Sequence, residues 1–115
     1  QLDLHPDGSF YTGAGTTKSG ALFSYHANWE SAGRWNIEVM TPKSKLIFKP
    51  LEQLHIQKIG STIIENVILD DELDKKFKPG IYKEVRSFLG NQKGLLSLEE
   101  QAENLKYYNK IGGRI

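Results

Sequence analysis

Two kinds of hydrophobic periodicity occupy separate parts of this chain. From Ala21 to Leu69 much of the sequence alternates apolar and polar residues, which is typical of strands with one buried face. After Pro79 and Gly80 the apolar residues recur every three or four positions, which is typical of helices. Strands that precede helices, rather than alternating with them, predict an α+β fold. We expect a mostly antiparallel, meandering sheet with C-terminal helices packed on one face.

The length of 115 residues predicts a single domain spanning 1–115. Within it we expect a turn-rich lead-in over 1–20, the sheet over 21–69, and a connector followed by helices over 70–115. In the lead-in, Gly13–Thr17 is interpreted as a glycine-rich turn. In the connector, the charged run Asp70–Lys76 is interpreted as a solvated loop.

The strongest strand pattern lies on either side of the loop Glu30–Arg34. Residues 23, 25, 27 and 29 before the loop are apolar, as are 35, 37 and 39 after it. Folding the chain with Trp29 opposite Trp35 matches apolar with apolar on one face and polar with polar on the other. We therefore predict a hairpin whose polar face pairs Asn28 with Asn36 and His26 with Glu38.

Three more strands and two helices complete the expected fold. The strands cover 45–49, 51–59 and 62–69, with a Gly60-Ser61 turn between the last two. The second helix opens at Ser97, which is expected to form a capping box with Glu100. Apolar stripes mark the two helices at Phe77, Ile81, Val85, Phe88 and Leu89, and at Leu98, Ala102, Leu105, Tyr107 or Tyr108, and Ile111.

Composition excludes several classes of function. Fifteen Lys and Arg against 14 Asp and Glu give a net charge of +1, which argues against nucleic-acid binding driven by charge. With no cysteine, the chain has no disulfide, thiolate metal site or cysteine nucleophile. The three histidines lie on separate expected elements, so we predict no metal site. The apolar runs are too short to cross a membrane, and we expect a cytoplasmic protein.

His26 is the most promising candidate for chemistry. Beside a carboxylate such as Glu38, an imidazole is suited to acid–base work or to binding a sugar hydroxyl. Asn28 and Asn36 would lie next to this pair on the same polar face. The alternative is a cross-strand polar pair on a wet sheet surface, because such pairs are common.

Trp29, Arg34 and Trp35 form a second candidate cluster at the end of the predicted hairpin. Aromatic rings beside an arginine can stack on a sugar or mark an interface. The alternative is that both Trp rings fill the core, because they share one face. The five candidate substrate-contact or interface residues are thus His26, Asn28, Arg34, Asn36 and Glu38. No complete catalytic, cofactor-binding or metal-binding set is found, and the glycines at 13 and 15 lack the context of a dinucleotide loop.

Several segments together resemble the C-terminal domain of the glucose–fructose oxidoreductase/inositol dehydrogenase (Gfo/Idh/MocA) family. They are Gly13–Gly15, Leu22–Trp35, Glu38–Thr41, Leu46–Glu52 and Phe77–Tyr82 with the apolar residues that follow it. The resemblance implies a C-terminal domain like that of dihydrodipicolinate reductase, whose sheet helps form a substrate pocket and a subunit interface. It also implies NAD(P), bound by an N-terminal Rossmann domain, and a sugar, sugar nucleotide or cyclitol as substrate.

The departures from the family pattern decide what this chain is expected to lack. The family's Glu-Lys-Pro tripeptide has no match, since Lys49-Pro50 and Lys78-Pro79 both follow Phe. Its cofactor loop and Asp-x-x-x-His motif are missing too, and the chain does not begin with Met. We therefore expect one part of a longer enzyme, inactive without its Rossmann domain and dimeric or larger through the sheet. The alternative is a stand-alone sheet module that binds a ligand or a protein.

Overall fold

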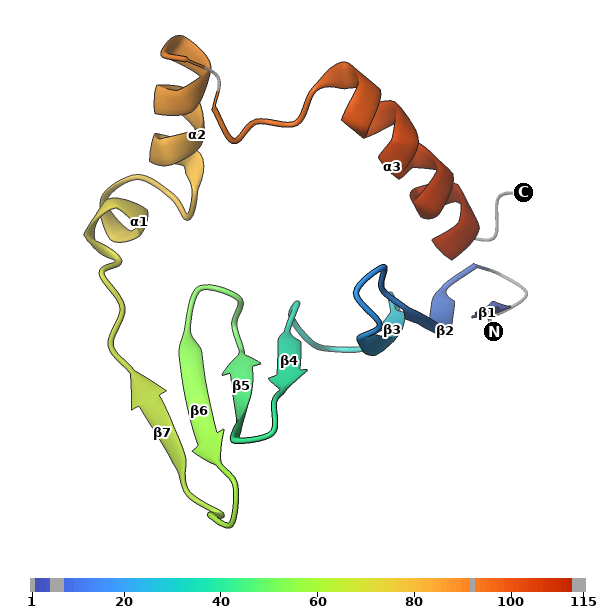
Figure 1. Ribbon diagram of the computed structural model, residues 1–115, viewed down its shortest axis with the longest axis vertical. Coiled ribbons are helices and arrows are strands. Elements are labelled where there is room, and N and C mark those ends of the chain that lie inside the picture. The colour runs from blue at the N-terminus through green and yellow to red at the C-terminus, as the bar shows by residue number, and fades with distance from the viewer. Residues whose placement is uncertain (1, 5–7, 92, 113–115) are drawn as a thin grey trace. The chain divides into compact units, whose positions relative to one another are not determined.

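The computed structural model describes residues 2–4, 8–91 and 93–112 (Figure 1). In this part of the chain, seven strands form two antiparallel sheets, and three helices follow them. The α+β class and the antiparallel strand pairing are thereby confirmed. The strands divide between two sheets, whereas the sequence pattern predicted one. The chain forms two compact units, Gln1–Ala32 with Leu96–Ile115, and Gly33–Leu95.

The first sheet contains β1 (Leu2–Leu4), β2 (Phe10–Thr16) and β3 (Leu22–Asn28), in that order. β3 confirms the strand expected after Ala21. β2 corrects the predicted glycine-rich turn, because Gly13 and Gly15 lie inside a strand. The register places Gly13 opposite Tyr25 and Gly15 opposite Phe23, and each aromatic ring covers the glycine facing it. Aromatic rings laid across cross-strand glycines supply the packing that glycine itself lacks.

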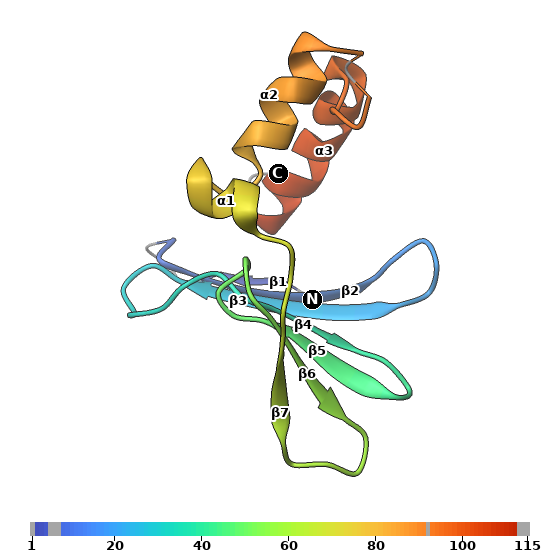
Figure 2. The same ribbon diagram turned by 90° about the vertical axis from the view of Figure 1, so that its left-hand side faces the viewer.

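The second sheet is a four-stranded meander of β4 (Ile37–Met40), β5 (Ser44–Phe48), β6 (Leu54–Lys58) and β7 (Ile64–Val67) (Figures 1 and 2). All four strands lie within segments predicted as strands, to within one residue. The turn between β6 and β7 contains Gly60 at a φ of 75°, a conformation that glycine adopts without strain.

The hairpin predicted about the loop Glu30–Arg34 is wrong. β3 pairs with β2, and β4 pairs with β5, so the two runs belong to different sheets. His26 therefore lies opposite Thr12, and Glu38 lies opposite Ile47. The alternation that suggested the hairpin shows only that each of the two strands has one apolar face. Such a face can pair with more than one neighbouring strand, so alternation alone does not identify the partner.

The register of the second sheet gives it one mainly apolar face and one face of mixed character. One face carries apolar residues at most positions of its two central rows, with Glu65 of β7 at the edge of one row; the apolar residues are Ile37, Val39, Leu46, Phe48, Leu54, Ile56 and Val67. We call these seven residues the apolar face of the second sheet. The opposite face is mixed, and carries Glu38, Lys45, His55, Gln57 and Asn66 together with Met40, Ile47 and Ile64. Such two-faced sheets normally pack one side and leave the other in water.

The helices are α1 (Glu72–Lys76), α2 (Ile81–Leu89) and α3 (Leu98–Ile111). α1 corrects the interpretation of the charged run as a loop. Its acidic residues lie in the first turn and its lysines in the last, which suits the helix dipole. Asp71 also pairs with Lys75 across one turn, with Nζ 2.8 Å from Oδ1. The hydrogen bond and charge of Asp71 raise the pKa of Lys75.

α2 and α3 confirm the two predicted helices and carry the expected apolar stripes, except that Phe77 lies before α2, at the end of α1. These stripes are nonetheless exposed in the structure: Val85 is 49% exposed and Leu105 54%. None of the described residues is buried. Packing of the helices on a sheet face stays a prediction. None of the helices in the described part combines the length and apolar character needed to span a membrane.

The predicted capping box at the start of α3 is confirmed. The Glu100 amide donates to Ser97 Oγ at 3.1 Å, and the Ser97 amide donates to Glu100 Oε2 at 2.8 Å. We predict that Ser97→Ala costs about 1 kcal/mol and lowers helicity near residue 98, because one amide loses its acceptor. Hydrogen exchange of the α3 amides measures this effect. Ser87→Ala inside α2 is the control, and equal loss of protection in both variants would contradict the prediction.

Candidate functional site

Three neighbouring polar side chains on one face of the first sheet form the candidate site. Thr12 on β2 lies directly opposite His26 on β3, and Asn28 lies two positions along the same strand. His26 and Asn28 are exposed, and Thr12 is half-buried. The Phe23 and Tyr25 rings point to the other face, over the glycines of β2. His26, Asn28 and Thr12 therefore form an accessible polar surface, which we call the His26 surface.

The hydrogen bonds of the His26 surface determine what it can offer a ligand. Thr12 Oγ1 donates to the carbonyl of Tyr25 at 3.2 Å, which leaves its lone pairs as acceptors. Asn28 Oδ1 accepts from the Glu30 amide at 2.9 Å, which leaves its NH₂ group as a donor. Together with the imidazole, these groups match hydroxyls, which both donate and accept hydrogen bonds.

Sequence reasoning missed Thr12, because it assigned the neighbouring glycines to a turn. The signal that could have found it is the spacing of the two glycines. They alternate as Tyr25 and Phe23 do, so one register sets each glycine against a ring.

The glycines at 13 and 15 do not fit a dinucleotide-binding loop. Both lie in β2, and the rings of Tyr25 and Phe23 occupy the space above them. A pyrophosphate needs open backbone amides at the start of a helix. The described residues of this segment therefore offer no cradle for NAD(P).

Arg34 and Asn36 lie in the segment between the two sheets, outside any strand. The Asn36 side-chain nitrogen donates to the Arg34 carbonyl at 3.4 Å. Trp29 and Trp35 flank this segment and are 69% and 71% exposed. Since none of the described residues is buried, the alternative in which both rings fill the core stays a prediction. Exposed aromatic rings beside an arginine remain suited to an interface or to a sugar ring.

Glu38 belongs to the second sheet and pairs with Lys45 on β5, with Nζ 3.1 Å from Oε2. Strand pairing therefore does not bring Glu38 to His26, which is a correction to the predicted pair. On its own face Glu38 shares a row with Ile47, His55 and Asn66. The five candidates thus fall into three groups, on β3, in the connecting segment and on β4. Among the residues the structure describes, no cluster of His, Asp and Glu is arranged to hold a metal ion.

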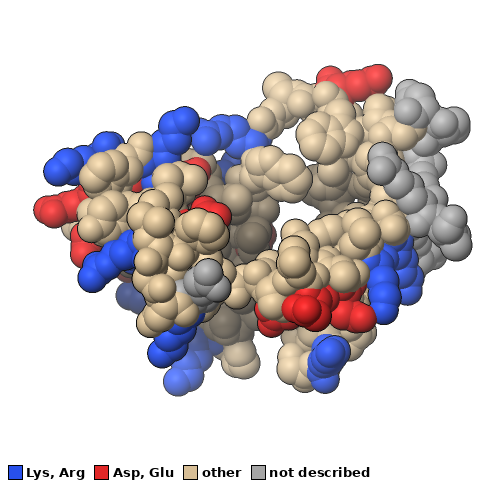
Figure 3. Space-filling view, turned by 90° about the horizontal axis from the view of Figure 1, so that it is seen from above, with Lys and Arg blue, Asp and Glu red and all other residues tan. Residues whose placement is uncertain are grey.

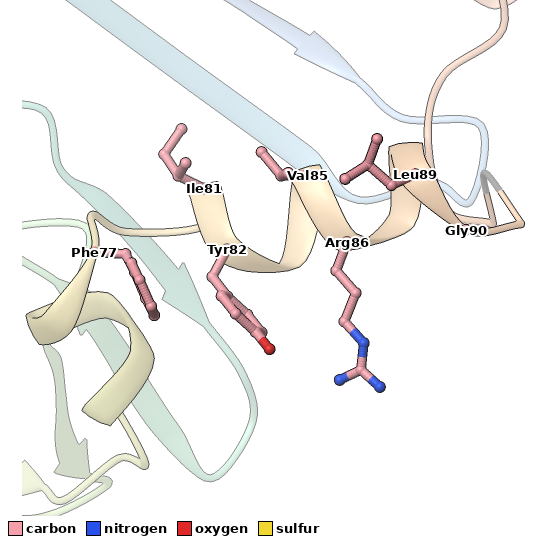
Figure 4. Close-up of a pocket in the computed structure, with 7 residues that line it drawn as sticks. All are labelled: Phe77, Ile81, Tyr82, Val85, Arg86, Leu89 and Gly90. Atoms are coloured by element: carbon pink, nitrogen blue, oxygen red, sulfur yellow. The ribbon is translucent and has the colours of Figure 1, made fainter.

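A groove of about 540 Å³ runs along α2. Figure 4 shows that Ile81, Val85 and Leu89 point to one side of the helix, while Tyr82 and Arg86 point to another. Phe77 stacks on Tyr82 with ring centroids 5.1 Å apart. The groove is therefore an open apolar flank with one guanidinium beside it, suited to packing rather than to catalysis.

On the face shown in Figure 3, charge does not single out a site among the described residues. On the face of the molecule shown in Figure 3, basic and acidic side chains are interspersed among uncharged ones. This pattern agrees with the net charge of +1.

Comparisons with protein-family models, with curated proteins and with solved structures give no match to this chain.

Proposed function

We propose that this chain is the C-terminal, substrate-binding and subunit-contact domain of an NAD(P)-dependent oxidoreductase. Its substrate is a sugar, a sugar nucleotide or a cyclitol, and its location is the cytoplasm. The observation that carries the proposal is the ordered likeness of Gly13–Leu89 to the Gfo/Idh/MocA C-terminal domain. The antiparallel α+β architecture agrees with that likeness.

Two surfaces of the chain suit the two parts of this role. The His26 surface presents hydroxyl, imidazole and amide groups, which are suited to holding substrate hydroxyls in place. The apolar face of the second sheet suits contact with another domain or with a second copy of the chain. Phe48 and Ile56 at its centre are only half-buried in the structure.

Hydride transfer itself belongs to the nicotinamide, which the Rossmann domain of the longer enzyme would supply. In the full enzyme, His26 and Asn28 are proposed to orient the substrate, and no catalytic residue is assigned to this chain. The alternative role, a stand-alone binding module, would use the same surfaces without any redox partner.

The full reading frame tests the proposal. We expect it to encode a Rossmann domain ahead of this chain, and the full protein to reduce NAD(P)⁺ with a polyol or sugar from a substrate panel, followed by absorbance. His26→Gln should lower kcat/KM by about 10-fold, because one orienting hydrogen bond is lost. The matched control is His55→Gln, on the second sheet, which should leave kcat/KM unchanged.

Cofactor binding by the isolated chain gives a result that could contradict the proposal. Titration with NADH, followed by its fluorescence, should show no saturable binding. Saturable binding, or oxidation of a polyol by the chain alone, would overturn the proposal. A reading frame that encodes only this module would favour the stand-alone alternative.

A further inference from the structure

One edge of the second sheet has unused pairing capacity. β7 pairs with β6 on one side, and the sheet order ends at β7 within the described part of the chain. On the outer side of an edge strand, the amides and carbonyls of alternate residues have no ladder partner. Such an edge can accept another strand.

The sequence around β7 is suited to a longer strand than the one formed. Residues 62–69 contain neither glycine nor proline, and five of the eight are β-branched. Four apolar side chains in this stretch are exposed, namely Ile63 (67%), Ile64 (55%), Ile68 (93%) and Leu69 (43%). The single charge is Glu65, which pairs with Lys58 of β6 at 3.3 Å. We call residues 63–69 the β7 edge.

The opposite edge of the same sheet lacks these properties. β4 is followed at once by Thr41 and Pro42, and the Thr41 hydroxyl donates to the Ser44 carbonyl at 2.9 Å to close a tight turn. Proline and a tight turn prevent the strand from growing in that direction. The β7 edge is therefore the better surface for strand addition.

We propose that the β7 edges of two copies of this chain pair antiparallel about a twofold axis, joining two four-stranded sheets into one. The axis passes at Asn66, which lies opposite Asn66 of the other copy. Ile64 then lies opposite Ile68, and Ile63 opposite Leu69. This inference rests on the part of the proposed function that gives the chain a second copy as partner.

Charge and side-chain pairing favour this register over the one whose axis passes at Glu65. Moving the axis by one residue to Glu65 would set two carboxylates directly opposite each other, which is destabilising, and would set Ile64 against Asn66. With the axis at Asn66, Glu65 faces Val67 and keeps Lys58 beside it. Directly opposed residues also lie on the same face, so the apolar faces of the two copies lie on the same side of the joined sheet, with Glu65 and Val67 of each copy at the junction.

Size-exclusion chromatography with light scattering tests the pairing on the full chain. We expect a dimer, and Ile68→Lys should weaken it by about 30-fold, because each dimer loses two isoleucine pairs. Ile68 lies outside the four residues that pair with β6, so this variant should retain its circular dichroism spectrum. Met40→Lys is the control, because Met40 is also a large exposed apolar residue (77%) and lies on the β4 edge.

Cross-linking tests the register, because the chain contains no cysteine of its own. Asn66→Cys should form a disulfide-linked dimer on mild oxidation, since directly opposed residues lie about 5 Å apart between Cα atoms. Met40→Cys should not. A dimer that resists Ile68→Lys, or that cross-links only through Met40→Cys, overturns the β7 pairing and leaves the proposed function standing. A chain that stays monomeric at all concentrations overturns both the pairing and the subunit contact in the proposed function.

Discussion

Leu46→Asn should destabilise the second sheet by about 3 kcal/mol, and Ile47→Asn by about 1 kcal/mol. The two residues are neighbours on β5 and are both half-buried, but they point to opposite faces. Leu46 lies between Val39 and Ile56 on the apolar face, so an amide there loses apolar contacts and gains no partner. Ile47 lies between Glu38 and His55, where a polar group finds polar neighbours.

Urea denaturation followed by circular dichroism measures both free energies of unfolding. The pair is matched, because each substitution removes a similar side chain and places the same amide in the same strand. Isoleucine favours strands more than leucine does, so strand propensity alone would make Ile47→Asn the costlier variant, opposite to the expected order. Equal destabilisation by the two variants would contradict the prediction that the face of Leu46 is the one that packs.

The apolar pattern predicted the strands well but not their partners. The segments that became β3 to β7 were identified from alternation and β-branched residues, which report local geometry. Partner choice depends on contacts between distant residues, and β3 fits β2 as well as it fits β4. The rejected pairing of His26 with Glu38 followed directly from that choice.

Two local structures were predicted wrongly, because the prediction relied on the composition of the segment and not on the contacts that its residues make. The charged run at 70–76 forms α1, since Asp71 and Lys75 support one another across a turn. The glycines of β2 suggested a turn, although Tyr25 and Phe23 cover them from the next strand. The capping box of Ser97 was predictable because its partners lie three residues apart. The His26 surface was found only in part, since Thr12 depends on the β2–β3 register.

Gly13→Val should destabilise the first sheet by about 2 kcal/mol, although valine favours strands more than glycine does. A Cβ at Gly13 would lie within 2.6 Å of Tyr25 Cζ, so the ring must leave its place over the strand. The displaced ring loses its packing on β2 and becomes exposed. Ala14→Val is the control on the adjacent, exposed position, and it should be neutral or slightly stabilising.

A double-mutant cycle with Tyr25→Ala identifies the cause. In the Tyr25→Ala background, Gly13→Val should cost nothing, which gives a coupling of about 2 kcal/mol between the two positions. Thermal unfolding monitored by circular dichroism measures all four variants. If Gly13→Val instead stabilises the chain as Ala14→Val does, the ring does not cover the glycine. The register of β2 on β3 would then lose its main support, and with it the placement of Thr12 opposite His26.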